Sequence, residues 1–122
     1  MNKDISILLP AKGICQYIFQ TLKSIEKSTL KPYEIIIVDD GIYESTKRDI
    51  EKTFKSLPIR IIENDGEGLI SALNTGLNNC TGKYVARIDA DDLMHPSRLE
   101  IQKKILDNNA NVVAIGSNIT FI

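Results

Sequence analysis

Short, almost continuously apolar runs alternate along this chain with stretches in which apolar residues recur every three or four positions. The first three runs are rich in isoleucine, which is typical of strands buried on both faces of a parallel sheet. The longer periodicity is typical of amphipathic helices. The pattern therefore predicts strands separated by helices. The expected strands are Ile5–Leu9, Glu34–Val38, Ile59–Ile62, Tyr84–Ile88 and Val112–Ile115.

Four apolar stripes with helical spacing separate these runs. They consist of Ile14, Ile18, Leu22 and Ile25; of Ile50, Phe54 and Leu57; of Leu69, Leu73 and Leu77; and of Leu99, Ile105 and Leu106. Ser45 is a candidate N-cap for the second helix, and Pro96 suits the first turn of the fourth, where no N–H is needed. Parallel strands need crossovers of this length. We therefore expect one α/β domain over residues 1–122, with a doubly wound, mostly parallel sheet and helices on both faces.

Charge and composition exclude several classes of function. With 15 basic and 16 acidic residues among 122, the chain has no electrostatic footprint for nucleic acid or anionic lipid. Cys15 and Cys80 have no partners at metal spacing, so we expect two reduced, half-buried helix residues rather than a disulfide framework or a zinc site. Neither a signal peptide nor a run of roughly 18 apolar residues is present. The expected location is the cytoplasm; peripheral association with the inner face of the membrane and homo-oligomers stay open.

Clustered acids follow the fourth expected strand, in the sequence Asp89-Ala90-Asp91-Asp92. Parallel sheets bind ligands outside the carboxyl ends of their strands, and a cluster of like charges is costly unless a cation neutralises it. Oxygen ligands favour Mg²⁺ or Mn²⁺. Asp89 and Asp91 can face one side and hold a metal and a ribose hydroxyl together. The alternative is a set of acids at the N-terminus of the next helix, which suits Asp92 better than Asp89.

A second acidic pair, Asp39-Asp40, follows the second expected strand and precedes Gly41. One of its carboxylates could accept a hydrogen bond from the N–H of a nucleobase. An ordinary Asp-Gly turn explains the pair equally well. The sequence alone leaves both interpretations open.

Two further motifs do not fit the chain, and the single histidine has a simple explanation. A calcium loop beginning at Asp89 needs glycine at its sixth position, where Met94 stands. The dinucleotide fingerprint beginning at Gly66 needs a third glycine, where Ser71 stands. His95 directly precedes Pro96, and we expect it to have a capping or structural role rather than a catalytic one.

Taken together, four segments resemble the inverting family-2 glycosyltransferases of the GT-A fold. They occur in the family's order, from about Asp4 to Gln102: ISILLP at Ile5–Pro10, EIIIVDDG at Glu34–Gly41, GLISALNTGL at Gly68–Leu77, and GKYVARIDADDLMHPSRL at Gly82–Leu99. Each segment is weak alone, but the ordered set with its DXD-type acids is specific.

The resemblance implies a role for each matching position. Pro10 and Ala11 would line the nucleoside pocket through their backbone, and Asp40, together with Asp39, would hold the base. Asp89 would contact the ribose beside a divalent metal, Mn²⁺ or Mg²⁺, that Asp91 coordinates and that bridges two phosphates. The implied donor is a nucleotide-diphosphate sugar, with UDP favoured. The implied acceptor is a hydroxyl of a glycan or lipid-linked molecule in bacterial-type surface polysaccharide synthesis, and the fold would place the first and fourth strands side by side.

The chain also departs from the family pattern. Lys12 and Gly13 stand where an aromatic-Asn pair often occurs, and Ile42 and Tyr43 stand where small polar residues are usual. The family's general base would lie beyond residue 122, so we expect a domain truncated at its C-terminal side, with little or no turnover by itself. The alternatives are a non-catalytic nucleotide-binding fragment or assembly module, and a phospho-receiver. A receiver would carry its acid pair after the first strand rather than the second.

Overall fold

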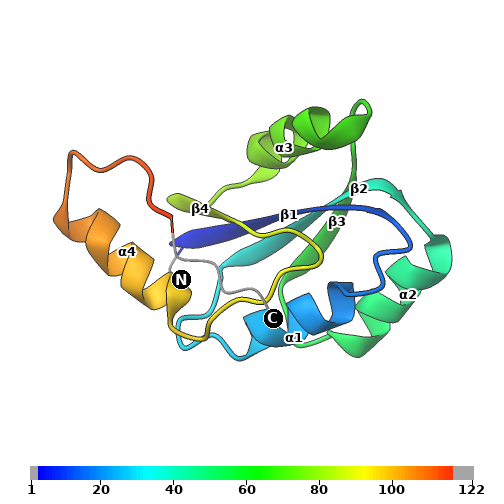
Figure 1. Cartoon of the computed structure of the whole chain (residues 1–122), viewed down its shortest axis with the longest axis horizontal. Helices are drawn as coiled ribbons and strands as arrows, with labels where there is room; N and C mark the ends of the chain where they lie inside the picture. Colours follow the sequence, from blue (N-terminus) through cyan, green and yellow to red (C-terminus); the bar gives the residue numbers. More distant parts are fainter. Residues whose placement is uncertain (1–2, 117–122) are drawn as a thin grey trace.

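The computed structural model describes residues 3–116 and confirms an α/β fold built on a parallel sheet. The strands are β1 (Ile5–Gly13), β2 (Glu34–Ile42), β3 (Ile59–Glu63) and β4 (Tyr84–Arg87), in the spatial order β3-β2-β1-β4. Each neighbouring pair is parallel, and β1 pairs with both β2 and β4 (Figure 1). The first and fourth strands therefore lie side by side, as the family resemblance implied.

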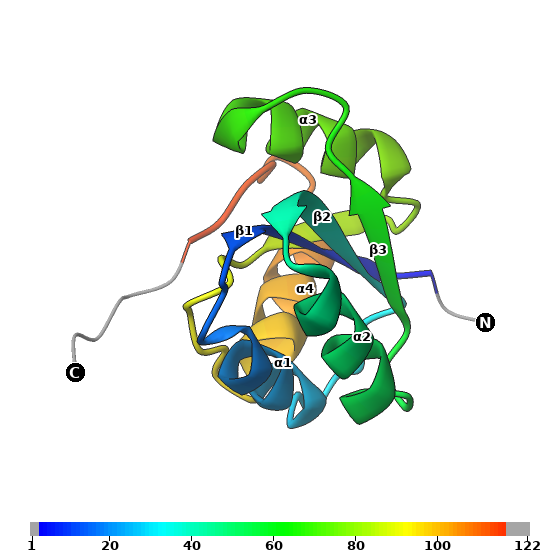
Figure 2. The same ribbon diagram turned by 90° about the vertical axis from the view of Figure 1, so that its right-hand side faces the viewer.

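Helices cover both faces of the sheet (Figures 1 and 2). Helix α3 (Gly68–Asn79) lies on one face, while α1 (Ile18–Glu26), α2 (Glu44–Thr53) and α4 (Arg98–Asn108) lie on the other. The larger apolar cluster contains Ile7, Leu9, Leu22 and Leu99 and fills the three-helix face. A smaller cluster around Leu8, Ile36 and Val38 packs under α3. The continuous apolar runs thus form strands that are buried on both faces, as their composition predicts.

Two strands extend further than the apolar runs suggest. β1 continues through Pro10 and Ala11 to Gly13, with a register shift between Ala11 and Gly13, and β2 continues through its acids to Ile42. The other two strands differ from the predicted bounds by one residue. β3 ends one residue later than predicted, at Glu63, and β4 ends one residue earlier, at Arg87. Pairing with a neighbouring strand, rather than side-chain hydrophobicity, decides where these strands end.

The starts of three helices differ from the sequence prediction. Helix α1 begins only at Ile18, so Ile14 lies outside it and is 65% exposed. The N-cap position of α2 is Tyr43 and not Ser45, which lies inside the helix. Pro96 precedes α4, whose N-cap is Ser97. Both cysteines are free and half-buried as expected, but Cys15 precedes α1 and Cys80 follows α3, so neither lies in a helix.

The expected apolar stripe on α3 is wrong. Leu69 and Leu77 are about half exposed, and the buried residues of the helix are Ala72, Thr75 and Gly76. At Gly76 a Cβ atom would lie only 1.9 Å from Leu8 Cδ1, so the helix approaches the sheet too closely for a larger side chain. Close packing on small residues therefore turns Leu69 and Leu77 outwards, while Leu73 is half-buried and packs against the smaller cluster.

The fifth expected strand is absent from the described part of the chain. Residues 112–116 form no ladder with β4, and Val113 is 95% exposed. The remaining residues of the apolar stretch that runs to Ile122 lie outside the described range. An apolar run forms a strand only where a partner supplies backbone hydrogen bonds, and no described strand does so here. No helix among residues 3–116 is both long and apolar enough to span a membrane.

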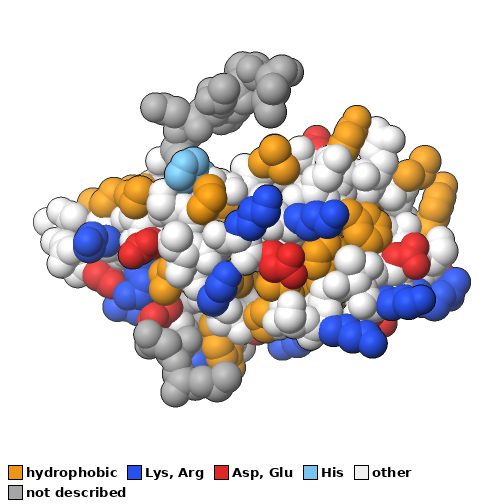
Figure 3. Space-filling view, turned by 90° about the horizontal axis from the view of Figure 1, so that it is seen from below, with side chains coloured by type: hydrophobic (Ala, Val, Ile, Leu, Met, Phe, Trp, Pro, Cys, Tyr) orange, Lys and Arg blue, Asp and Glu red, His pale blue; other side chains and the backbone are white. Residues whose placement is uncertain are grey.

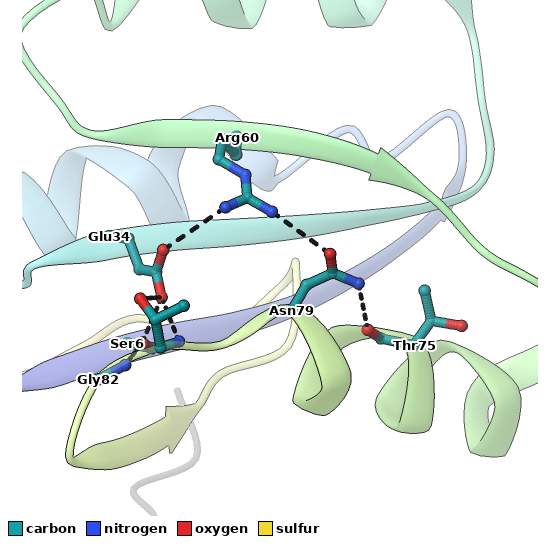
Figure 4. A network of polar contacts seen from close by, with 7 residues as sticks. Ser6, Glu34, Arg60, Thr75, Asn79 and Gly82 are labelled. Carbon is teal, nitrogen blue, oxygen red and sulfur yellow. Dashed lines mark hydrogen bonds and ion pairs between the residues drawn. The ribbon is translucent and has the colours of Figure 1, made fainter.

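A polar network joins the amino ends of the strands (Figure 4). The Glu34 carboxylate accepts hydrogen bonds from Ser6 Oγ (2.6 Å) and from the N–H and hydroxyl of Thr81 (2.7 and 3.0 Å). Ser6 Oγ in turn accepts one from the N–H of Gly82 (2.8 Å). Nη1 of Arg60 lies 3.9 Å from the other carboxylate oxygen, Oε1 of Glu34. The network ties the start of β4 to β1 and β2.

We expect Glu34→Gln to lower stability at pH 7 by about 1–3 kcal/mol. The hydrogen bonds that Ser6 and Thr81 donate to one carboxylate oxygen would lose their charge assistance, and the amide NH2 would face Arg60. Burial by itself raises the pKa of Glu34, but the hydrogen bonds from Ser6 and Thr81 outweigh it and hold the pKa below its usual value. A group with a lowered folded-state pKa stabilises the fold above its unfolded-state pKa, and this stability is lost as the pH falls through the folded value.

The wild-type melting temperature should therefore fall more steeply than that of Glu34→Gln once the pH drops below about 4.3, the ordinary pKa of glutamate. Thermal denaturation of both proteins across this range measures the difference. Glu51→Gln, at an exposed position on α2, is the matched control and should follow the wild type. If the melting temperatures of the wild type and Glu34→Gln fall equally steeply with pH, Glu34 does not have a lowered pKa in the folded protein.

Candidate functional site

The carboxyl ends of β1, β2 and β4 meet at one edge of the sheet. Ala11 of β1 is in register with Asp39 of β2, and Leu8 of β1 is in register with Arg87 of β4. The N–H of Ile88 extends the second pairing by donating to the carbonyl of Leu8 (3.1 Å). The acids that follow β2 and β4 therefore flank the end of β1.

Three carboxylates converge directly after β4. Asp89, Asp91 and Asp92 each offer an oxygen atom, and these atoms lie within 4.8 Å of one another. Asp89 is half-buried and the other two are exposed. A turn closed by the Asp92 N–H on the Asp89 carbonyl (3.1 Å) brings the side chains together. A convergent set of carboxylate oxygens suits a hard divalent cation.

Asp92 belongs to this group, although the sequence analysis did not place it in the metal site. The only signal in the sequence was that Asp92 directly follows Asp91. The sequence pattern alone also fits a role for Asp92 at the positive end of the next helix. Helix α4 begins at Arg98, so Asp92 lies six residues before it, outside its first turn. The helix-dipole interpretation of these acids therefore loses its structural basis.

Helix α1 holds the loop that carries these acids. Thr21 Oγ1 donates to the carbonyl of Ala90 (3.1 Å), and the N–H of Met94 donates to Ser24 Oγ (2.9 Å). Met94 is buried in the main core. Further along the loop, Ser97 Oγ and His95 Nδ1 lie 2.9 Å apart and the Arg98 N–H donates to the His95 carbonyl, which is the structural role expected of His95.

Two arginines accompany the acids. Arg87, the last residue of β4, donates from Nη2 to Asp89 Oδ1 over 3.3 Å, and both side chains are about half exposed. Arg98 of α4 donates to the Arg87 carbonyl (3.1 Å) and to Gln102. Arg87 is not among the site residues predicted from the sequence. The available signal was its spacing of two residues from Asp89, which places both side chains on one side of an extended chain.

The Asp39 carboxylate mainly stabilises the turn that follows it. Its Oδ1 accepts hydrogen bonds from the N–H groups of Gly41 (2.9 Å) and Ile42 (2.6 Å), and its Oδ2 pairs with Lys47 Nζ at 2.7 Å. Burial raises the pKa of Asp39, but the hydrogen bonds from Lys47, Ile42 and Gly41 outweigh this and lower the pKa overall. Gly41 adopts φ +103°, a conformation that favours glycine. The turn interpretation therefore describes Asp39 well.

Asp40 connects β2 to the N-terminus of α3. Its carboxylate accepts hydrogen bonds from Asn64 Nδ2 (3.0 Å) and from the N–H of Gly68 (3.2 Å). Asn64 also accepts from the hydroxyls of Ser71 (2.7 Å) and Thr75 (3.1 Å), so it organises the loop before α3. Asn64 is not among the site residues predicted from the sequence, because its partners at the end of β2 and in α3 lie far apart in the chain.

The structure places the predicted site residues along one edge but does not gather them into one cluster. Pro10 is half-buried and pairs with Val38, while Ala11 is buried beside Asp39. Within residues 3–116, the convergent acids come from the β4 loop alone and include neither Asp39 nor Asp40. The site therefore has two parts, one at the end of β2 and one after β4, with β1 between them.

The charge on the surface is mixed. Figure 3 shows lysine and arginine side chains spread over the lower face of the molecule, among acidic and apolar ones. This face therefore carries no strong charge of either sign.

Comparisons with known proteins agree on one family. The sequence profile of "Glycosyl transferase family 2" matches residues 6–121. The amylovoran biosynthesis glycosyltransferase AmsE of Erwinia amylovora is 38% identical over 100 residues, which are 80% of this chain and 38% of AmsE. The chain spans less than two fifths of the length of the curated relatives that it matches first.

Two solved structures are similar in fold. Staphylococcus aureus TarS in complex with UDP-GlcNAc superposes with a TM-score of 0.77 at 23% identity, covering 86% of this chain and 31% of TarS. The mannosyltransferase PcManGT of Pyrobaculum calidifontis, in complex with GDP-Man and Mn²⁺, superposes with a TM-score of 0.67 at 26% identity. That match covers 83% of this chain and 31% of PcManGT.

Proposed function

The chain belongs to glycosyl transferase family 2, and we propose that it binds the nucleotide diphosphate of a sugar donor at the carboxyl edge of its sheet. In the whole enzyme this part would present the donor for transfer of its sugar to an acceptor hydroxyl. The observation that carries the proposal is the convergence of three carboxylates within 4.8 Å directly after β4, beside the end of β1.

The donor atoms after β4 fit a divalent cation. Asp91, with Asp89 beside it, would hold Mn²⁺ or Mg²⁺, and Asp92 completes an all-oxygen set that suits either ion. When bound, such an ion stabilises negative charge on a departing diphosphate. PcManGT was solved with Mn²⁺, which supports the same choice of cofactor here.

The nucleoside would lie across β1 towards the end of β2. Pro10 and Ala11 would line its pocket through their backbone, and Asp89 would reach the ribose. Of the two acids after β2, Asp40 is the better acceptor for a base N–H. It accepts from two groups, whereas Asp39 accepts from three, one of them the charged amine of Lys47. UDP is the favoured nucleotide, and the UDP-GlcNAc complex of the similar TarS supports that preference.

Transfer would proceed by a single displacement at the anomeric carbon, with a general base outside these 122 residues deprotonating the acceptor. The relative AmsE acts in amylovoran biosynthesis, which supports an acceptor in surface polysaccharide synthesis. The second candidate is a nucleotide-binding module without turnover. Hydrolysis and transfer assays with UDP-sugars separate the two, and we expect little or no turnover by this chain alone.

We expect thermal denaturation to show a much larger stabilisation when Mn²⁺ and a nucleoside diphosphate are present together than with either one alone. UDP should give the largest shift in melting temperature among UDP, GDP and ADP. UMP with Mn²⁺, and UDP with a chelator, are the matched controls and should give small shifts. A shift that is the same without metal, or no shift with any nucleotide, would refute the proposal.

A further inference from the structure

Arg87 lies on the open part of the sheet. Its neighbours Ala86 and Ile88 are buried in the core on the three-helix face, so the alternation of the strand points Arg87 towards the opposite face. Helix α3 covers that face mainly over β1 and β2. β4 is the edge strand of the described sheet. The exposed guanidinium therefore has room to change its position.

The contact of Arg87 with Asp89 engages a carboxylate that belongs to the convergent group. Nη2 of Arg87 donates to Oδ1 of Asp89 over 3.3 Å, and Asp89 is one of the three convergent acids. A guanidinium and a divalent cation repel each other strongly at this range. A cation among the acids would therefore displace the Arg87 head group from Asp89.

The second arginine cannot take over this role in the described structure. Arg98 donates from Nη2 to the carbonyl of Arg87 and from Nε to Gln102, so its head group is engaged with the backbone of β4 and with its own helix. Arg87 has only one described hydrogen bond for a head group with five N–H donors. Of the two arginines, Arg87 is therefore the one suited to exchange partners.

We propose that Arg87 alternates between two anions, holding Asp89 before the donor binds and contacting the diphosphate of the donor once the metal has displaced it. This inference rests on the proposed function, because it needs the metal and the diphosphate at this edge. Arg87 would thus be a specificity-determining residue for diphosphates. It would weaken binding of the free metal and strengthen binding of the metal together with the nucleotide.

The test uses Arg87→Gln, which keeps a polar side chain and removes the charge. We expect binding of Mn²⁺ alone, followed by electron paramagnetic resonance, to become about three- to tenfold tighter because a neighbouring positive charge is lost. At saturating Mn²⁺, binding of UDP measured by calorimetry should become about tenfold weaker, because a charge-assisted hydrogen bond is lost. Arg87→Lys should lie between the wild type and Arg87→Gln in both measurements.

Lys83→Gln is the control for an unspecific change of charge. Lys83 is exposed and pairs with Asp107, roughly 13 Å from Arg87 along the strand. This variant should bind both ligands as the wild type does. If Arg87→Gln binds UDP as tightly as the wild type, or more tightly, the proposed contact with the diphosphate is wrong.

If Arg87→Gln leaves the affinity for Mn²⁺ alone unchanged, the proposed competition at Asp89 is wrong. If the wild type binds neither Mn²⁺ nor UDP with Mn²⁺, the proposed function fails, and the role of Arg87 fails with it. The behaviour of the wild type thus separates failure of the function from failure of the Arg87 inference. Circular dichroism of each variant checks that the fold is retained.

Discussion

Asp91→Asn is expected to abolish the stabilisation that Mn²⁺ and UDP together give to the wild type. A ligand whose free concentration is about 100 times its Kd adds about 2.7 kcal/mol to the free energy of unfolding. Asparagine keeps the size of aspartate but carries no charge and only one acceptor oxygen, so it is a poor ligand for a hard cation. Asp91 is exposed, so the substitution should leave the melting temperature without ligand almost unchanged.

The experiment compares thermal denaturation of both proteins with Mn²⁺ alone, UDP alone and the two together. Asp49→Asn is the matched control, because Asp49 is an exposed acid on α2 and lies outside the convergent group. It should retain the full shift. A full metal-dependent shift in Asp91→Asn would show that this residue does not hold the cation.

Gly82→Ala is expected to cause a large loss of stability, about 2–4 kcal/mol. A Cβ atom at this position would lie 2.7 Å from both the backbone nitrogen and Oγ of Ser6, and 3.0 Å from the carbonyl carbon of Ile5. Because two of these atoms belong to the backbone of β1, a rotamer change cannot relieve the overlap. The displacement would also weaken the hydrogen bond from the Gly82 N–H to Ser6 Oγ.

Chemical denaturation would measure the loss, and the melting temperature should fall by roughly 10 °C. Gly116→Ala provides the comparison, since no atom of the described residues lies within 4 Å of a Cβ at Gly116. That variant should unfold close to the wild type. A Gly82→Ala protein as stable as the wild type would mean that β4 can shift along β1 without cost.

The strand and helix order follows from the sequence because its physical cause is local. A strand buried on both faces needs an almost continuous apolar run, and Ile5–Leu9 and Glu34–Val38 provide it. The alternation of such runs with helical stripes then restricts the fold to a parallel α/β sheet. The pairing of β1 with β4 could not be read from periodicity, and the family resemblance supplied it.

The errors arose where packing across the fold outweighs hydrophobicity. The leucines of α3 predict a buried stripe, but the sheet approaches the helix at Gly76, and the small residues face the core instead. Val112–Ile115 is apolar enough for a strand but has no partner in the described sheet. Helix α1 begins after Ile14, which leaves an apolar residue exposed.

The sequence by itself determined the class of fold and the place where an acidic site must lie, because both depend on residue types at short spacing. Only the tertiary structure decided what each acid does. Asp39 stabilises a turn and pairs with Lys47. Asp40 accepts a hydrogen bond from Asn64, and Asp89 accepts one from Arg87. Charges and hydrogen bonds act over a few ångströms, and such distances between segments far apart in the chain exist only once the strands have been placed side by side.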